Sequence, residues 1–195
     1  MVAWTPNFGY KMAWLAIRNT TPQDIIQKLY LPDMQTINWD VAMDRIYEKD
    51  DPIIITPRIH TWCFVVGRYL YDLGSYSDDL TKLKNRIVEF SNVFEEVQAF
   101  ATHRVSEYHH WLRAKNGKVD RCFAYVGESG RILCNEGEIT DEEKQFPWDK
   151  LETFQWFPKE QDVMIIAGKW SINPTLIQSK DPSDKLCYIG TIPSL

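Results

Sequence analysis

The sequence predicts an α+β fold in a single domain spanning 1–195, with a mostly antiparallel sheet and helices packed on one of its faces. Three observations lead to this prediction. Asn116-Gly117, between two apolar runs, is the strongest hairpin signal in the chain. Residues 61–67 are rich in β-branched and aromatic side chains, which favours a strand. Residues 80–91 and 160–170 carry apolar side chains on one helical face, which predicts two helices that cover the sheet.

The N-terminal part of the chain contains a strand followed by a helix. Residues 12–18 form a short apolar run that predicts a buried strand. Thr21 then precedes Pro22, and Asp24 follows three residues after Thr21. A hydroxyl cap, a proline in the first turn and an acid near the helix N-terminus together predict that a helix begins here.

Residues 96–135 are expected to form a three-stranded antiparallel meander. Within them, 97–113 should be one long strand with a bend or bulge, because a straight strand of that length would span about 56 Å. The Asn-Gly turn would pair Leu112 with Arg121. A second turn at residues 127–130, Gly-Glu-Ser-Gly, leads into the third strand.

The composition excludes several classes of protein. The net charge is −5 and the pI is about 5.4, whereas nucleic-acid binding needs a positive surface to neutralise phosphates. The N-terminus lacks the basic and apolar regions of a signal peptide, and no apolar run approaches the ~18 residues that span a bilayer. We therefore expect a cytoplasmic protein that binds neither nucleic acid nor membranes.

The four cysteines are far apart in the chain and form no CxxC pair, which argues against a zinc ribbon or a thioredoxin-like site. Without a secretory signal they are expected to be free buried thiols. Cys122 and Cys134 lie on neighbouring predicted strands, and the sequence leaves open whether these two approach each other.

Three of the four histidines lie close together in the predicted long strand. On a regular strand His103, Glu107 and His109 would share one face, and Arg104 and Tyr108 would share the other. A straight strand separates His103 from His109 by about 20 Å, too far for one metal ion. No metal site and no cofactor are predicted, and a polar concave face of the sheet is the expected role of this stretch.

A hydrolase hypothesis would use His103 or His109 as general base and Ser106 or Cys122 as nucleophile. The expected register places Cys122 opposite Trp111 and so close to the histidines. However, neither a nucleophile elbow nor a cysteine–histidine signature surrounds these residues. No catalytic residue is therefore predicted.

Residues 136–158 are first acidic and then rich in proline and aromatic residues, including Trp148. One interpretation is a surface for a basic partner, and the other is a solvated loop that also caps a helix, since Thr140 and Glu143 match a capping box. The eight Trp, nine Tyr and nine Phe residues allow the same two interpretations, an aromatic-lined groove or a core of large rings.

Several segments resemble a group of uncharacterised bacterial proteins. The chain is also similar to them in its opening Trp-Leu-Ala-Ile-Arg strand and its Thr-Pro helix start, so the resemblance covers most of residues 10–175. These proteins in turn resemble the small acidic immunity-type proteins that accompany secreted polymorphic toxins. The resemblance implies a protein-binding role and no catalytic residues, and it rests on the segments 96–98, 102–109, 125–130, 135–137 and 169–175.

The leading functional prediction is a non-enzymatic protein-binding protein that neutralises a bacterial toxin by occluding it, with a basic toxin domain as the expected partner. The alternatives are a small-molecule-binding protein or hydrolase centred on residues 102–111, and a homodimer with a structural role. The candidate binding residues come from the histidine stretch, the turn at residues 127–130 and the 136–158 segment; they are His103, Arg104, Glu107, Tyr108, His109, Glu128 and Trp148.

Overall fold

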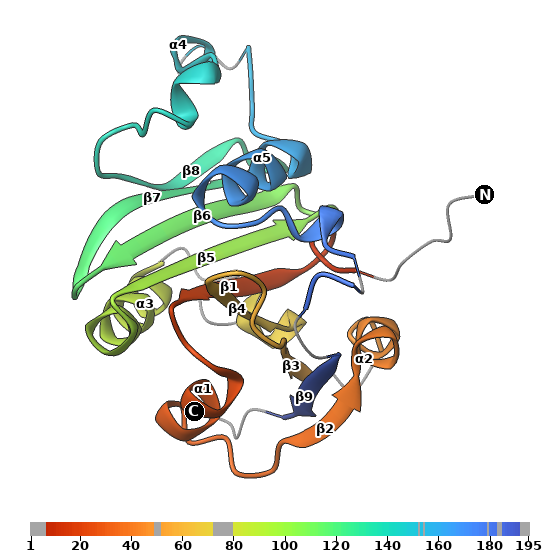
Figure 1. Cartoon of the computed structure of the whole chain (residues 1–195). Coiled ribbons are helices and arrows are strands. Elements are labelled where there is room, and N and C mark those ends of the chain that lie inside the picture. Colours follow the sequence, from red (N-terminus) through yellow and green to blue (C-terminus); the bar gives the residue numbers. More distant parts are fainter. Residues whose placement is uncertain are drawn as a thin grey trace.

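The computed structural model describes residues 7–48, 52–71, 80–151, 153, 155–178, 180–182 and 185–191. These residues form one nine-stranded antiparallel sheet in the order β2-β9-β3-β4-β1-β5-β6-β7-β8 (Figure 1). The α+β fold with an antiparallel sheet is therefore confirmed. The strands are β1 (Ala13–Arg18), β2 (Gln35–Asn38), β3 (Ile53–Ile55), β4 (Trp62–Val66), β5 (Glu96–His103), β6 (Tyr108–Lys115), β7 (Lys118–Val126), β8 (Arg131–Glu136) and β9 (Leu186–Gly190).

Helices α1, α3 and α5 begin at or within one residue of where the sequence predicts them, whereas α2 and α4 were not predicted. In α1, Thr21 forms the expected capping box with Asp24, and α5 has the predicted bounds. In the described part of the chain none of the helices is long and apolar enough to cross a bilayer. The helices are α1 (Pro22–Lys28), α2 (Trp39–Arg45), α3 (Thr81–Phe94), α4 (Trp148–Leu151) and α5 (Glu160–Trp170).

The helices cover both faces of the sheet, so the prediction that 80–91 and 160–170 pack on one face is wrong. Helix α5 packs on the face that carries Trp111, whereas α3 packs on the opposite face, which carries Leu112 (Figure 1). The reason lies in the strands, where successive residues such as Trp14 and Leu15 are both buried. A sheet that is apolar on both faces needs a cover on each.

The predicted long strand 97–113 is instead the hairpin β5–β6, with a turn at residues 104–107. Glu107 adopts a left-handed conformation with φ of 49°, which reverses the chain without a glycine. The backbone N–H groups of Gly127 and Glu128 donate to the carbonyls of Glu107 and Ser106 at 3.0 and 3.2 Å. The β7–β8 turn thus supports this turn, and the meander has four strands rather than three.

The β6–β7 hairpin turns at Asn116-Gly117 and the β7–β8 connection at residues 127–130, as predicted. A bulge next to the first turn shifts the register, so that Leu112 pairs with Cys122 and not with Arg121. Arg121 lies opposite Arg113 as a result. Since side chains alternate along a strand, this one-residue shift moves Arg121 from the α3 face to the α5 face.

Candidate functional site

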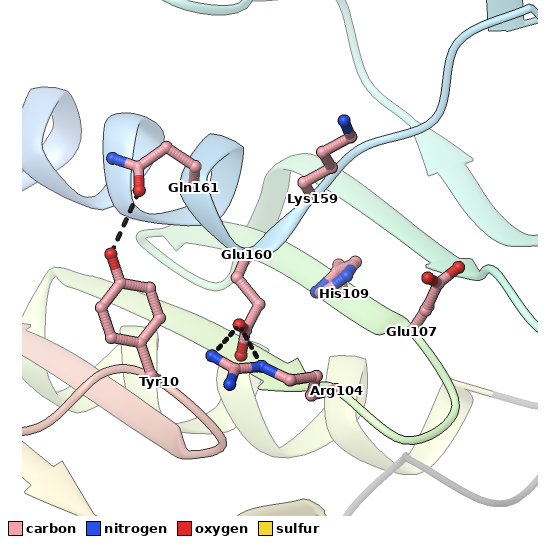
Figure 2. Close-up of a pocket in the computed structure, with 7 residues that line it drawn as sticks. All are labelled: Tyr10, Arg104, Glu107, His109, Lys159, Glu160 and Gln161. Carbon is pink, nitrogen blue, oxygen red and sulfur yellow. Dashed lines mark hydrogen bonds and ion pairs between the residues drawn. The ribbon is translucent and has the colours of Figure 1, made fainter.

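An open cavity of about 400 Å³ lies where the β5–β6 turn, the N-terminus of α5 and the segment before β1 meet. Three of the predicted site residues line it, and the others come from distant parts of the sequence (Figure 2). Its lining is polar and carries both signs of charge, which suits a small polar ligand better than an apolar one. The lining residues are Tyr10, Arg104, Glu107, His109, Lys159, Glu160 and Gln161.

An ion pair between Arg104 and Glu160 joins the turn to the helix. The Arg104 Nε and Nη2 atoms donate to Glu160 Oε2 at 2.9 and 2.7 Å, and the backbone N–H of Lys11 donates to Oε1 at 3.3 Å (Figure 2). Tyr10 closes the same side by donating its hydroxyl to Gln161 Oε1 at 3.1 Å. These contacts hold Arg104 against Glu160 and form one wall of the cavity.

His109 lies on β6 and is only 3% exposed, although its imidazole lines the cavity. Burial lowers the pKa of His109 to about 4, and the carboxylate of Glu160 opposes part of that shift. The imidazole is therefore neutral at pH 7. Its Nδ1 atom has no hydrogen-bond partner among the described residues. Buried polar groups are usually paired, so this nitrogen is a candidate partner for a polar group bound in the cavity.

Lys159 and Glu107 supply two further charges of opposite sign to the cavity, and the charge of Lys159 also acts on Asp162, where it opposes the rise in the pKa of that carboxyl. Both side chains are exposed, and neither forms an ion pair with any residue that the structure describes. Figure 2 shows Lys159 above the His109 imidazole and Glu107 to its right. Lys159 directly precedes α5, whose N-terminus carries a partial positive charge. The cavity thus offers a positive end, a negative end and a neutral imidazole.

The remaining predicted site residues lie elsewhere. His103 bonds to Ser106 within the β5–β6 turn, with 2.8 Å between Nδ1 and Oγ. Tyr108 is buried on the opposite face of the sheet, where its hydroxyl lies 2.8 Å from His110 Nδ1. Glu128 is exposed in the β7–β8 turn. The structure therefore brings together Arg104, Glu107 and His109 and leaves the others outside the cavity.

Trp148 belongs to an aromatic cluster on the α5 face and does not line the cavity. It meets Phe123 edge-on at a centroid distance of 5.0 Å and donates its Nε1–H to the Glu143 carbonyl at 2.8 Å. Trp111 and Trp156 contact it as well. The aromatic residues of this region therefore contribute mainly to the core.

The two nucleophiles of the hydrolase hypothesis do not join His109. Cys122 is fully buried and faces α3, and it lies opposite Leu112 rather than Trp111. Ser106 has His103 as a hydrogen-bond neighbour, but this is a contact within one turn and lies outside the cavity lining. In the described residues no group of three or more His, Cys, Asp or Glu side chains is arranged to hold a metal ion.

Sequence reasoning missed Tyr10, Lys159, Glu160 and Gln161. The start of α5 at Glu160 is predicted, but nothing in the sequence indicates that it meets the β5–β6 turn, more than fifty residues earlier in the chain. Arg104 forms its ion pair with this helix. The only available signal was the position of an acid and a lysine at a helix start.

The comparisons with known proteins identify no relative. No protein-family model, no curated protein and no solved structure matches this chain. The resemblance to immunity-type proteins therefore stays a prediction.

Proposed function

We propose that the protein binds a small zwitterionic molecule, such as a free amino acid or a dipeptide, in the cavity beside His109. The observation that carries this proposal is the nearly buried imidazole of His109, whose Nδ1 has no partner among the described residues, in one cavity with the opposite charges of Glu107 and Lys159. A ligand carboxylate would pair with Lys159 and the N-terminus of α5. A ligand ammonium group would pair with Glu107.

The state of His109 supports a polar ligand rather than a second ion pair. A neutral imidazole donates through one nitrogen and accepts through the other, so it can bond to an uncharged N–H or hydroxyl group of the ligand. The Arg104–Glu160 ion pair forms one wall of the cavity. The volume of about 400 Å³ is at the small end of the range for ligand sites.

Isothermal titration calorimetry with the standard amino acids and simple dipeptides tests this proposal. At least one should bind with a Kd below about 1 mM. The N-acetyl and amide derivatives of the best ligand, each lacking one charge, should bind at least ~10-fold more weakly. The proposal would be overturned if none of the compounds bound, or if both derivatives bound as tightly as the parent ligand.

Matched substitutions locate the site. Lys159→Met and Glu107→Gln should each weaken binding about 10-fold, since each removes one ion pair with the ligand. Lys169→Met, at the other end of α5, and Glu128→Gln, in the neighbouring turn, make the same chemical changes away from the cavity. Equal losses in the control variants would show that binding occurs elsewhere.

A second candidate function, neutralisation of a basic toxin domain, is favoured by the acidic segment that follows β8. Glu138 and Asp141 are exposed there, and the buried Glu143 fastens the segment to the sheet. A rigid acidic surface is suited to occluding a basic partner. This candidate continues the protein-binding prediction and the resemblance to immunity-type proteins.

Retention of proteins from a native extract at low salt tests the second candidate. A basic protein should bind stoichiometrically, and the double variant Glu138→Lys/Asp141→Lys should release it. The double variant Asp44→Lys/Glu89→Lys changes the net charge equally at exposed positions on α2 and α3 and should retain it. Neutralisation would be contradicted if both double variants retained the partner equally, or if no partner was retained by the wild-type protein.

A further inference from the structure

Two cysteines lie side by side near the edge of the sheet, on the face opposite the cavity. Cys122 on β7 pairs with Glu136 of β8, and Cys134 of β8 pairs with Ala124 of β7. The two cysteines are therefore diagonal neighbours on one face, a position from which side chains can touch. Both belong to the core on the α3 side.

The two thiols interact directly. The interaction between them lowers the pKa of Cys134 to about 7 and raises that of Cys122. Lys84 on α3 lowers the pKa of Cys134 further through its charge, and Glu136 opposes this effect. Cys134 is thus the thiol that ionises first.

Lys84 is held over this pair by an ion pair with Glu136, in which Nζ lies 2.7 Å from Oε2. The ion pair closes a contact between α3 and the edge strand. Because Glu136 lies opposite Cys122 in the register, the ammonium group sits beside both thiols. A cation in this position stabilises a thiolate.

Access to the two cysteines differs. Cys134 is half-buried on the edge strand β8, and Cys122 is 1% exposed beneath it. A small solute can therefore reach Cys134 but not Cys122. This is the arrangement of an attacking thiol with a resolving thiol behind it.

We propose that Cys134 and Cys122 form a reactive dithiol site whose substrate is a hydroperoxide. The Cys134 thiolate attacks one peroxide oxygen, so that an S–O bond forms, the O–O bond breaks and the other oxygen leaves as alkoxide or hydroxide. Cys134 is thereby oxidised to a sulfenic acid, and the peroxide is reduced. The Cys122 sulfur then attacks Cys134, forming an S–S bond, and the hydroxyl leaves as water with the Cys122 proton.

Treatment of the folded protein with hydrogen peroxide at pH 7, followed by mass mapping of its peptides, tests the proposal. We expect a disulfide that joins the peptides of Cys122 and Cys134, with a mass lower by two hydrogens, and its reversal by dithiothreitol. Cys63 and Cys187, both fully buried, should remain thiols and serve as internal controls. Over-oxidation of Cys134 without a disulfide, or reaction at Cys63 or Cys187 first, would overturn it.

Variants distinguish the attacking thiol, Cys134, from the resolving thiol, Cys122, and control for an effect of the substitutions on folding. Cys122→Ser should leave a sulfenic acid at Cys134 that dimedone traps, whereas Cys134→Ser should leave Cys122 unreacted. Lys84→Met should slow the reaction by about 5- to 10-fold at pH 7, because a smaller fraction of Cys134 is thiolate. Lys82→Met, an exposed residue on the same helix, should not. If Cys134 is oxidised at the same rate in Lys84→Met and Lys82→Met, Lys84 does not activate Cys134.

Discussion

Arg121 Nε lies 2.9 Å from both carboxylate oxygens of Glu143, and neither side chain has any exposed surface. The pair connects β7 to the segment that follows β8. Trp111 Nε1 donates to the same carboxylate at 2.9 Å, and Arg121 Nη1 donates to Asn135 Oδ1 at 2.8 Å. A buried charge needs such a network, because removing one partner leaves the other charge without compensation.

Glu143→Gln should therefore lower the free energy of unfolding by about 3–5 kcal/mol, measured by urea denaturation. Glu48→Gln, which breaks the exposed pair with Arg45, should change it by less than about 1 kcal/mol. If the two variants lose the same stability, the Arg121–Glu143 pair is solvated in solution. Thr140 also loses a carboxylate partner in Glu143→Gln, which adds to the effect.

The stability should fall on acidification in a way that depends on His109. The pKa of His109 is about 4 in the folded protein and about 6.5 in the unfolded chain. The unfolded state therefore takes up the proton first, and stability is lost as the pH falls from 6.5 towards 4. The loss that His109 contributes at pH 5 is about 2 kcal/mol.

Urea denaturation at pH 7 and pH 5 measures this effect. In His109→Gln the difference between the two pH values should shrink by about 2 kcal/mol. His60→Gln, at an exposed histidine, should leave it unchanged. Buried His110, whose pKa falls to about 3, titrates in the same range, so the variant should keep part of the pH dependence.

Gly137 should not tolerate a side chain. Its φ is 85°, and a Cβ atom there would lie 2.3 Å from the Asp120 carbonyl oxygen. Gly137→Ala should cost about 1–3 kcal/mol of unfolding free energy, from backbone strain and the clash. Gly168→Ala, in the interior of α5 and without a left-handed φ, should stay within about 1 kcal/mol of the wild type.

Trp148→Ala distinguishes a packing role from a role in partner binding. Loss of the ring contacts and of the bond to Glu143 should lower stability by about 2–4 kcal/mol and expose residues 137–158 to limited proteolysis. Leu176→Ala, at a residue that is 71% exposed, should change stability by less than about 0.5 kcal/mol. If the stability of Trp148→Ala is unchanged, the Trp148 side chain does not contribute to the core and remains available for partner binding.

Local patterns predicted much of the fold. Thr21 and Asp24 cap α1 as expected, and the Asn116-Gly117 hairpin and the 160–170 helix are where the sequence places them. These features depend on contacts between residues close in the chain. The Cys122–Cys134 contact could not be predicted, because it depends on the exact register of β7 and β8, which a bulge alters.

The candidate site was only partly predictable because it depends on contacts between distant segments. Arg104, Glu107 and His109 were identified by their residue types, although the strand they were assigned to is a hairpin. The turn at residues 104–107 contains neither glycine nor Asn-Gly, so no local signal marks it. Glu143 was expected in a solvated loop, since its partner Arg121 turns inward only because of the bulge.

The position of β9 within the sheet restricts the order in which the protein can fold. This strand lies between β2 and β3, so Gln35 is paired with Ile189, and β2 has no other neighbour among the described strands. During synthesis, β2 and α2 therefore cannot complete their packing until β9 has been synthesised. In that interval the apolar side chains of Trp39 and Met43 lack their final cover. Nascent chains of this protein should depend on chaperones until the pairing closes.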